Sequence, residues 1–337
     1  MKVNSTVKLP HAGLVVLWLL ANCSLAWAQL VPGSMDVHWG EGAANCATSS
    51  QPPLQVHQYN PRTFILRENL CATFEAPFMY LLVGTTKALL IDTGDVADPR
   101  RMPLARTVLA LLPEKGATKL PLLVVHTHRH LDHRAGDPQF AGLPNAEVVG
   151  FELESVRKYF GFDHWPSGIA QVDLGGRTVD VLPTPGHNPT HLSFYDRATG
   201  LFFSGDFLLP GRLLIEDTET DLASARRAAD FARDRPVTFV LGGHIEQNQA
   251  GELYPWESQY HPQERALQLT KEDLLALPAI VTTFNGFYTK EAGFTMSNPV
   301  HVLYAIGGAA LLVAVLLLVL IVRYFRRRRR RQAASLP

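Results

Sequence analysis

The sequence predicts a mixed α/β fold in which two β-sheets carry helices on their outer faces, followed by one membrane-spanning helix. Short apolar runs separated by turn residues begin at about residue 56, and such runs are typical of strands. Stretches of helical periodicity interrupt them. The resulting order is strands, helix, strand, helix, strands, helix, strand. This order favours two sheets over a single parallel sheet.

The first half of this domain is predicted to contain three consecutive strands and one helix. Residues 64–66, 79–83 and 88–91 are apolar, and the turn residues 84–86 join the last two of them as a hairpin. Residues 98–112 predict the helix, because a proline opens the segment and its leucines recur on one face.

The second half of the domain continues the alternation. Further strands are predicted at 121–125, 146–150, 178–182, 191–195, 201–204 and 237–241. Further helices are predicted at 152–160, 222–233 and 263–277. Residues 29–55 are rich in Gly, Ser, Ala and Pro and are interpreted as an irregular lead-in. The functional domain is expected at 56–262, and 263–299 is expected to be a helical connector to the membrane helix.

The N-terminus has the layout of a secretory signal peptide. Two lysines precede an apolar run from Leu14 to Leu20, and small residues at Ala26 and Ala28 then mark a cleavage site. Residues 1–28 are therefore predicted to be a signal that directs export. An uncleaved N-terminal anchor and a lipoprotein attached at Cys23 are the alternatives.

The C-terminus predicts a single membrane span. Residues 302–322 form an uncharged run of 21 residues, and a helix of that length crosses a hydrocarbon core of about 30 Å. Arg323 and the arginines 326–331 follow at once. Because positive charge marks the cytoplasmic side, the tail 323–337 is expected in the cytoplasm and the domain outside it, in the periplasm or extracellular space. A buried core helix is the alternative.

The charge balance and the cysteines add two further expectations. Residues 29–299 hold 22 Lys and Arg against 31 Asp and Glu. This acidic body argues against nucleic acid as a partner, because phosphate contacts need basic side chains. Cys46 and Cys71 form an even pair in an oxidising compartment, so a disulfide between them is predicted. Two free thiols are the alternative.

One loop concentrates the residues that carry chemistry. His128, His130, Asp132 and His133 place three imidazoles and a carboxylate within six residues. Histidine is the commonest metal ligand in proteins. Alternation along an extended turn sends the first two side chains to one side and the last two to another. One loop can therefore supply ligands to two adjacent metals.

Three more candidate ligands follow predicted strands. His187, Asp206 and His244 each come directly after a glycine, which allows the backbone to pass close to a crowded site. The ligand set contains nitrogen and oxygen without a thiolate, which suits zinc and also iron or manganese.

The spacing of these residues resembles that of the metallo-β-lactamase superfamily. Its His-x-His-x-Asp-His motif is similar to residues 128–133, its later His, Asp and His match the three further candidates, and the resemblance covers about 56–250. It implies an αββα four-layer sandwich. It also implies that one metal is held by His128, His130 and His187, and a second by Asp132, His133 and His244, with Asp206 bridging them.

Other positions take supporting roles in this resemblance. Asp92, in a Leu-Ile-Asp-Thr-Gly segment, is expected behind the ligands rather than on a metal, and His191 likewise. Asp132 is expected both to ligate and to orient or shuttle a proton. An Asp at position 206 resembles the glyoxalase II and lactonase branches, although lactonases often carry a Tyr where this chain has Leu209.

The predicted function is that of an exported, membrane-tethered hydrolase with two zinc ions, where iron or manganese are the alternatives. Two such ions lower the pKa of bound water to about 7 and polarise a carbonyl, which suits attack on a small ester, lactone, thioester or amide. The bilayer is a partner through the C-terminal helix, and no envelope protein partner is indicated. The alternatives are an iron-dependent, dioxygenase-like oxidoreductase and a non-catalytic membrane-bound binding protein.

Overall fold

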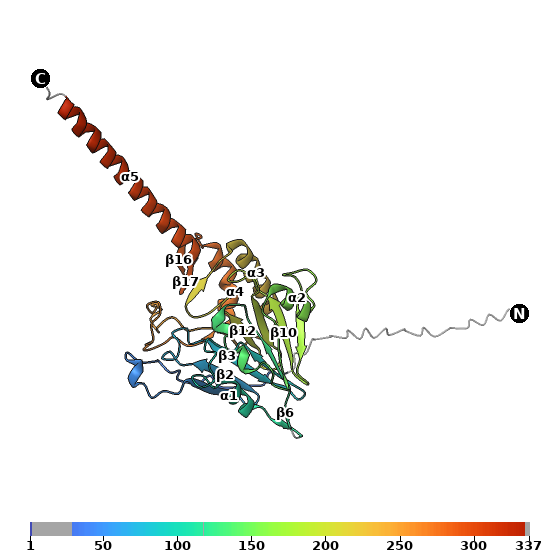
Figure 1. Ribbon diagram of the computed structural model, residues 1–337. Coiled ribbons are helices and arrows are strands. Elements are labelled where there is room, and N and C mark those ends of the chain that lie inside the picture. The colour runs from blue at the N-terminus through green and yellow to red at the C-terminus, as the bar shows by residue number, and fades with distance from the viewer. Residues whose placement is uncertain (2–28, 117, 334–337) are drawn as a thin grey trace.

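The computed structural model describes residue 1 and residues 29–116 and 118–333, so the predicted signal peptide lies largely outside the described residues. Two six-stranded sheets form the centre of the domain (Figure 1). In spatial order, the first sheet contains β1 (Leu54–Asn60), β2 (Thr63–Glu68), β3 (Phe78–Val83), β4 (Ala88–Ile91), β7 (Leu122–Val125) and β8 (Ala146–Val148). The second contains β15 (Gln268–Leu269), β14 (Phe239–Gly242), β12 (Leu201–Gly205), β11 (Leu192–Asp196), β10 (Thr178–Pro183) and β9 (Ala170–Asp173).

The pairing of the strands brings the ends of distant segments to one edge. In the first sheet β4, β7 and β8 run parallel to one another. In the second sheet β12 and β14 run parallel, while their other neighbours are antiparallel. The chain therefore leaves β7, β12 and β14 toward loops that carry the predicted ligands, and loops held on such a scaffold are common positions for functional sites.

Three hydrophobic cores build the layers. Between the sheets, side chains such as Tyr80 of β3 and Phe203 of β12 pack with their ring centroids 4.6 Å apart. A second core joins the outer face of the first sheet to α1 (Leu104–Leu111). A third joins the outer face of the second sheet to α3 (Thr218–Arg233) and α4 (Lys271–Thr282). This arrangement is the αββα sandwich, and it confirms the predicted fold class.

Smaller elements complete the domain. They are α2 (Leu153–Phe160), the hairpin β5 (Glu114–Lys115) and β6 (Thr118–Lys119), and the short helices Cys46–Thr48, Leu131–His133 and Asp137–Gln139. A three-stranded sheet has the order β13 (Arg212–Leu214), β17 (Phe294–Ser297) and β16 (Tyr288–Glu291). A disulfide joins Cys46 to Cys71 and fixes the lead-in to the loop after β2.

Several predicted helix boundaries are wrong, because local turns and caps decide where a helix begins. The helix expected at 98–112 begins only at Leu104, because the chain first turns through hydrogen bonds to the Asp98 carbonyl. The helix expected at 222–233 begins earlier, at Thr218, where the Asp217 carboxylate accepts a hydrogen bond from the Thr220 amide.

The connector between the domain and the C-terminal helix also differs from the prediction. The helix expected at 263–277 lies at Lys271–Thr282, where Thr270 and Asp273 form a capping box. The remainder, expected to be a simple connector, holds the β16–β17 hairpin. Its pairing with β13 depends on partners more than 70 residues away in sequence, which local periodicity does not reveal.

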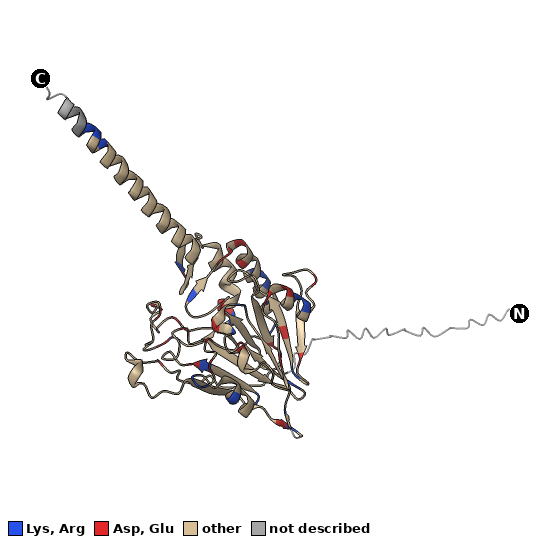
Figure 2. Cartoon of the chain, viewed as in Figure 1, with Lys and Arg blue, Asp and Glu red and all other residues tan. Residues whose placement is uncertain are grey.

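The final helix, α5 (Pro299–Ala333), projects away from the domain (Figure 1). Among the described residues, its segment Pro299–Arg327 is the one helix long and apolar enough to cross a membrane, and its side chains are exposed along this length. Figure 2 shows an uncharged stretch that ends at arginines.

Candidate metal centre

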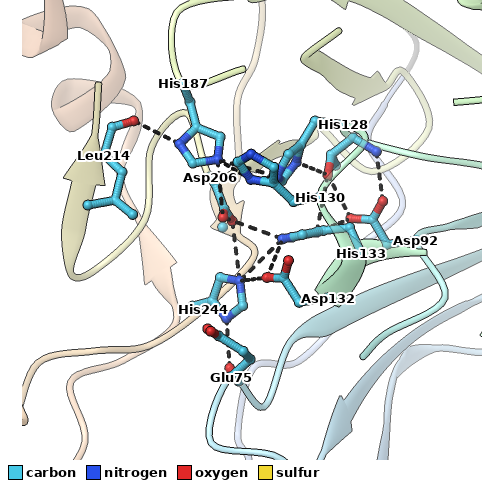
Figure 3. A network of polar contacts seen from close by, with 12 residues as sticks. Glu75, Asp92, His128, His130, Asp132, His133, His187, Asp206, Leu214 and His244 are labelled. Atoms are coloured by element: carbon cyan, nitrogen blue, oxygen red, sulfur yellow. Dashed lines mark hydrogen bonds and ion pairs between the residues drawn. The ribbon is translucent and has the colours of Figure 1, made fainter. Parts of the chain in front are cut away.

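The loops that follow four strands converge on one site (Figure 3). Residues 128–133 follow β7, His187 follows β10, Asp206 follows β12 and His244 follows β14. Seven candidate ligands thus arrive from segments far apart in the chain. They gather into two groups, and within each group the ligand atoms lie within 4.8 Å of one another.

The first group, here called the trihistidine cluster, consists of His128, His130 and His187. His128 Nε2 lies 2.9 Å from His130 Nδ1, and His187 Nε2 lies 3.3 Å and 3.1 Å from those two atoms. The ring planes of each pair are nearly perpendicular. Three nitrogen atoms therefore point at one another from different directions.

The second group, here called the carboxylate cluster, consists of Asp132, His133, Asp206 and His244. Nε2 of His133 and Nε2 of His244 are 3.2 Å apart. Asp132 Oδ2 lies 3.3 Å from each of these nitrogens. Two imidazoles and two carboxylates therefore share one pocket.

Asp206 lies between the two clusters. Its Oδ2 is 3.4 Å from His133 Nε2 and 3.7 Å from His187 Nε2, so one oxygen faces both groups. Its Oδ1 is buried and has no hydrogen-bond partner among the described residues. Gly243 lies so close that a Cβ there would clash with Oδ1, which explains the need for glycine.

Acceptors outside the clusters orient the rings. His133 Nδ1 lies 2.9 Å from Asp92 Oδ2, His187 Nδ1 lies 2.7 Å from the Leu214 carbonyl, and His244 Nδ1 lies 2.7 Å from the Glu75 carbonyl. These contacts leave each Nε2 facing the site. Ligating histidines in metalloproteins are usually held in this way through their other ring nitrogen.

Asp92 has the position expected of a supporting residue. It is buried and adopts a left-handed backbone conformation with φ of 67°, and its carboxylate also accepts a hydrogen bond of 2.7 Å from the Thr127 amide. His191 stacks on His128 with ring centroids 5.2 Å apart, and its Nδ1 lies 2.9 Å from Thr184 Oγ1. His191 thus packs behind the trihistidine cluster.

Sequence reasoning missed several neighbours of the site. Asn188 Nδ2 lies 3.0 Å and Glu216 Oε1 3.7 Å from His130 Nε2. The position of Asn188 beside His187 is a signal that could have found it, whereas Glu216 has no signal in the sequence. Leu209, at the position where lactonases often carry Tyr, is buried in the core under α3.

The electrostatic character of the two clusters differs. Burial, followed by neighbouring histidines, holds the pKa of His128 well below its usual value, and burial also lowers the pKa of His187. Burial acts in the same direction on His133 and His244, but carboxylates led by Asp206 outweigh it and raise the pKa of both. His128 and His187 therefore favour the neutral form, whereas His133 and His244 are stabilised with a positive charge.

These properties fit metal cations. Imidazole nitrogens whose lone pairs converge repel one another unless a cation or proton lies between them. In the same space the buried Asp206 Oδ1 accepts no hydrogen bond from the described residues and lies 3.5 Å from His244 Nε2. The donor set of nitrogen and carboxylate oxygen suits zinc, iron and manganese. The residues present therefore fit a dinuclear metal centre.

Comparison with known proteins gives a consistent result. The family model of the metallo-beta-lactamase superfamily matches residues 72–244. An acyl-coenzyme A thioesterase of Gallus gallus is 27% identical over 58% of this chain and 82% of its own length. A hydroxyacylglutathione hydrolase of Dechloromonas aromatica is 31% identical over 43% of this chain, which spans about half (48%) of that protein. A solved metallo-beta-lactamase of Hirschia baltica has a TM-score of 0.47 and 15% identity, covering 68% of this chain and 98% of its own.

Proposed function

Because this chain belongs to the metallo-beta-lactamase superfamily, whose model matches over half of it, we propose that it is an exported, membrane-tethered hydrolase with two metal ions. Its substrate is a small ester, lactone, thioester or amide. The observation that carries the proposal is the convergence of the two clusters on Asp206 Oδ2. A shared carboxylate between two ligand groups supports paired metals better than two independent sites.

The proposed ligand sets follow from this geometry. His128, His130 and His187 would hold one ion, and Asp132, His133 and His244 the other, with Asp206 common to both. When bound, two zinc ions supply a carbonyl-polarising Lewis acid and a water whose pKa is lowered to about 7.

The remaining steps belong to side chains of the chain itself. Asp132 is 20% exposed, whereas His133 beside it is fully buried, so Asp132 is the carboxylate that both ligates and reaches the open side of the site. There it can orient the attacking water and hold its proton. Asp92 keeps His133 in the tautomer that presents Nε2, and the Leu214 and Glu75 carbonyls do so for His187 and His244.

The proposed location rests on both ends of the chain. The predicted signal would export the domain, and the exposed apolar helix Pro299–Arg327 would cross the bilayer with its arginines in the cytoplasm. The disulfide between Cys46 and Cys71 is consistent with an oxidising compartment. Protease treatment of cells whose outer envelope is permeabilised while the cytoplasmic membrane stays intact tests this location: export predicts cleavage of the domain, and a domain that stays protected while a known exported protein is cleaved contradicts it.

Similarity to a thioesterase and to hydroxyacylglutathione hydrolases favours a thioester among the four substrate classes. The test is a panel of ester, lactone, thioester and β-lactam substrates given to the zinc-loaded full chain, with Asp206→Ala as the inactive comparison. Turnover that the variant lacks supports the proposal. A metal-loaded chain inactive on every class contradicts it.

A further inference from the structure

A cavity of about 560 Å³ opens beside the trihistidine cluster. Pro185, Gly186 and Pro189, which flank His187 in sequence, form one wall. Glu216, which forms another, reaches to within 3.7 Å of His130. His130 and His187 do not line the cavity themselves, but its wall is formed by residues that contact or flank them, so the cavity lies next to the trihistidine cluster.

The cavity offers a mostly apolar surface. Its apolar lining comes from α2, α3 and the loops between the strands, and consists of Leu153, Trp165, Pro166, Pro185, Pro189 and Ala223. Trp165 is half-buried against Phe162, with ring centroids 5.7 Å apart. A pocket of this size and lining suits an alkyl chain, because such a chain gains free energy when it leaves water.

The charged residues of the cavity are mainly acidic. Three carboxylates, from Glu216, Asp217 and Glu219, line it together with one guanidinium, from Arg227. Arg227 donates a hydrogen bond of 2.7 Å to the Pro183 carbonyl, so its charge is held at the inner wall. The acidic rim would repel an anionic group and attract a cationic one.

The same wall is connected to the start of the membrane helix. The Ile215 amide donates to the Ser297 carbonyl at 2.9 Å, and Asn298 Nδ2 donates to the Glu216 carbonyl at 3.1 Å. Helix α5 begins at the next residue, Pro299. In Figure 1, α3 and the β16–β17 hairpin lie on the side of the domain from which α5 leaves.

Exposed aromatic residues surround the foot of this helix. Phe287 and Tyr288, at the tip that leads into β16, are 47% and 48% exposed, and Tyr304 on α5 is 73% exposed. Aromatic residues of this kind concentrate at membrane–water interfaces. The cavity wall therefore lies next to the predicted bilayer surface.

We propose that this cavity binds the alkyl chain of a cationic amphiphile taken from the membrane surface, with its hydrolysable acyl bond at the metal centre. The inference rests on the proposed hydrolase function and specifies its substrate class. The apolar lining takes the chain, the carboxylates of Glu216, Asp217 and Glu219 attract the cationic group, and the link to α5 gives access from the bilayer.

The test uses the zinc-loaded full chain in phosphatidylcholine nanodiscs and two thioesters of equal size. One is dodecanoylthiocholine, and the other is the dodecanoyl thioester of mercaptoethanesulfonate, which carries the opposite charge. Hydrolysis of either compound releases a free thiol, which a thiol-reactive dye measures. The cationic thioester is expected to have a kcat/KM at least about tenfold higher, because the acidic rim repels the sulfonate. Equal rates, or faster hydrolysis of the sulfonate, would overturn the proposal.

Two variants connect this preference to the cavity. Ala223 is exposed on α3, so Ala223→Trp fills the cavity without disturbing the core, and it should lower the ratio of dodecanoyl- to acetylthiocholine hydrolysis by about tenfold. Glu219→Lys should lower the ratio of kcat/KM for the cationic thioester to kcat/KM for the sulfonate thioester. Glu272→Lys is its matched control, since both glutamates lie in the first turn of a helix and only Glu219 lines the cavity. An equal effect of both lysine variants would contradict the assignment.

Photolabelling tests whether the cavity binds an alkyl chain independently of whether the protein hydrolyses a substrate. A diazirine-bearing dodecyltrimethylammonium has no hydrolysable bond, and it is expected to label peptides containing Trp165 or residues 216–227, less so in Ala223→Trp. If the probe labels these peptides but the protein hydrolyses no substrate of any class in the panel, the cavity is supported and the hydrolase function is rejected. Hydrolysis with labelling elsewhere would reject the cavity and leave the hydrolase function intact.

Discussion

The two halves of the metal centre differ in the charge that they present. The trihistidine cluster contains only imidazole nitrogens and no carboxylate, and its His130 side chain is 36% exposed. The carboxylate cluster combines two imidazoles with Asp132 and Asp206, and its His133 is fully buried.

The surroundings of the clusters differ in how closely a carboxylate approaches. A backbone carbonyl contacts one ring in each cluster, at His187 and at His244. The Asp92 carboxylate lies 2.9 Å from His133 in the second cluster, whereas the nearest outer carboxylate in the first, that of Glu216, lies 3.7 Å from His130. Because carboxylates offset the charge of a cation directly, we expect the second position to bind metal more tightly. The comparison teaches that the two ligand groups, which share Asp206, offer a cation two unequal positions.

The largest effect is expected where the two clusters meet. Asp206→Ala should lower hydrolysis by about 10³-fold or more, because residues that act as a unit lose most of their function together. Asp230→Ala, on the exposed face of α3, is the control and should retain activity. Initial rates with the best substrate of the panel test this. Activity retained by Asp206→Ala would mean that the clusters work separately.

Removing one ligand from each cluster compares the two positions. His187→Ala and His244→Ala should each lower the metal content from two ions to one. The ion left in His187→Ala sits in the carboxylate cluster and should resist a chelator about tenfold better than the ion left in His244→Ala. Chelator titration with elemental analysis measures this, and equal or reversed resistance would refute the comparison.

Changing the supporting residues should produce a smaller effect. Asp92→Asn keeps a side chain that tolerates the left-handed conformation but removes the charge next to His133. It should weaken metal binding in the carboxylate cluster by about 10- to 100-fold. Asn188→Ala, beside His130, should weaken the trihistidine cluster by a smaller factor, because it removes only a neutral contact. Competition with a metal-sensitive dye measures the metal dissociation constants of both variants.

A last expected effect concerns the stability of the fold rather than metal binding or turnover. Burial raises the pKa of Glu68 to about 8, although hydrogen bonds from the Asp95 and Val96 amides oppose it. A raised carboxyl pKa means that the folded state binds the proton more tightly, so this contribution is complete below about pH 4.5 and is lost as the pH rises to about 8. The free energy of unfolding, measured with denaturant, should fall less between pH 5 and pH 8 in Glu68→Gln than in the unsubstituted protein. An unchanged pH dependence in the variant would show that Glu68 is not responsible.

Much of this site was predictable because its ligands lie in short local patterns. The spacing of residues 128–133 predicts a loop that serves two metals. The glycines directly before His187, Asp206 and His244 can likewise be read from the sequence without knowledge of the tertiary structure. The strands before these loops are short and largely apolar, so the sequence also predicts where each ligand falls relative to a strand.

The surroundings of the site were not predictable, because they depend on contacts between distant segments. The carbonyls of Glu75 and Leu214 reach their histidines only after the two sheets pack, and a backbone carbonyl leaves no trace in the sequence. The same is true of Glu216, whose position follows from the pairing of β13 with β17. Helix ends were misplaced where side-chain caps at Asp217 and Thr270 override periodicity.

The most direct measurement is the metal content of the purified full chain by elemental analysis. The account predicts two zinc ions per chain, because seven nitrogen- and oxygen-bearing side chains form two clusters around Asp206. Iron in their place would turn the interpretation toward an oxidoreductase. A folded chain that binds no metal when zinc is supplied would contradict the metal centre itself.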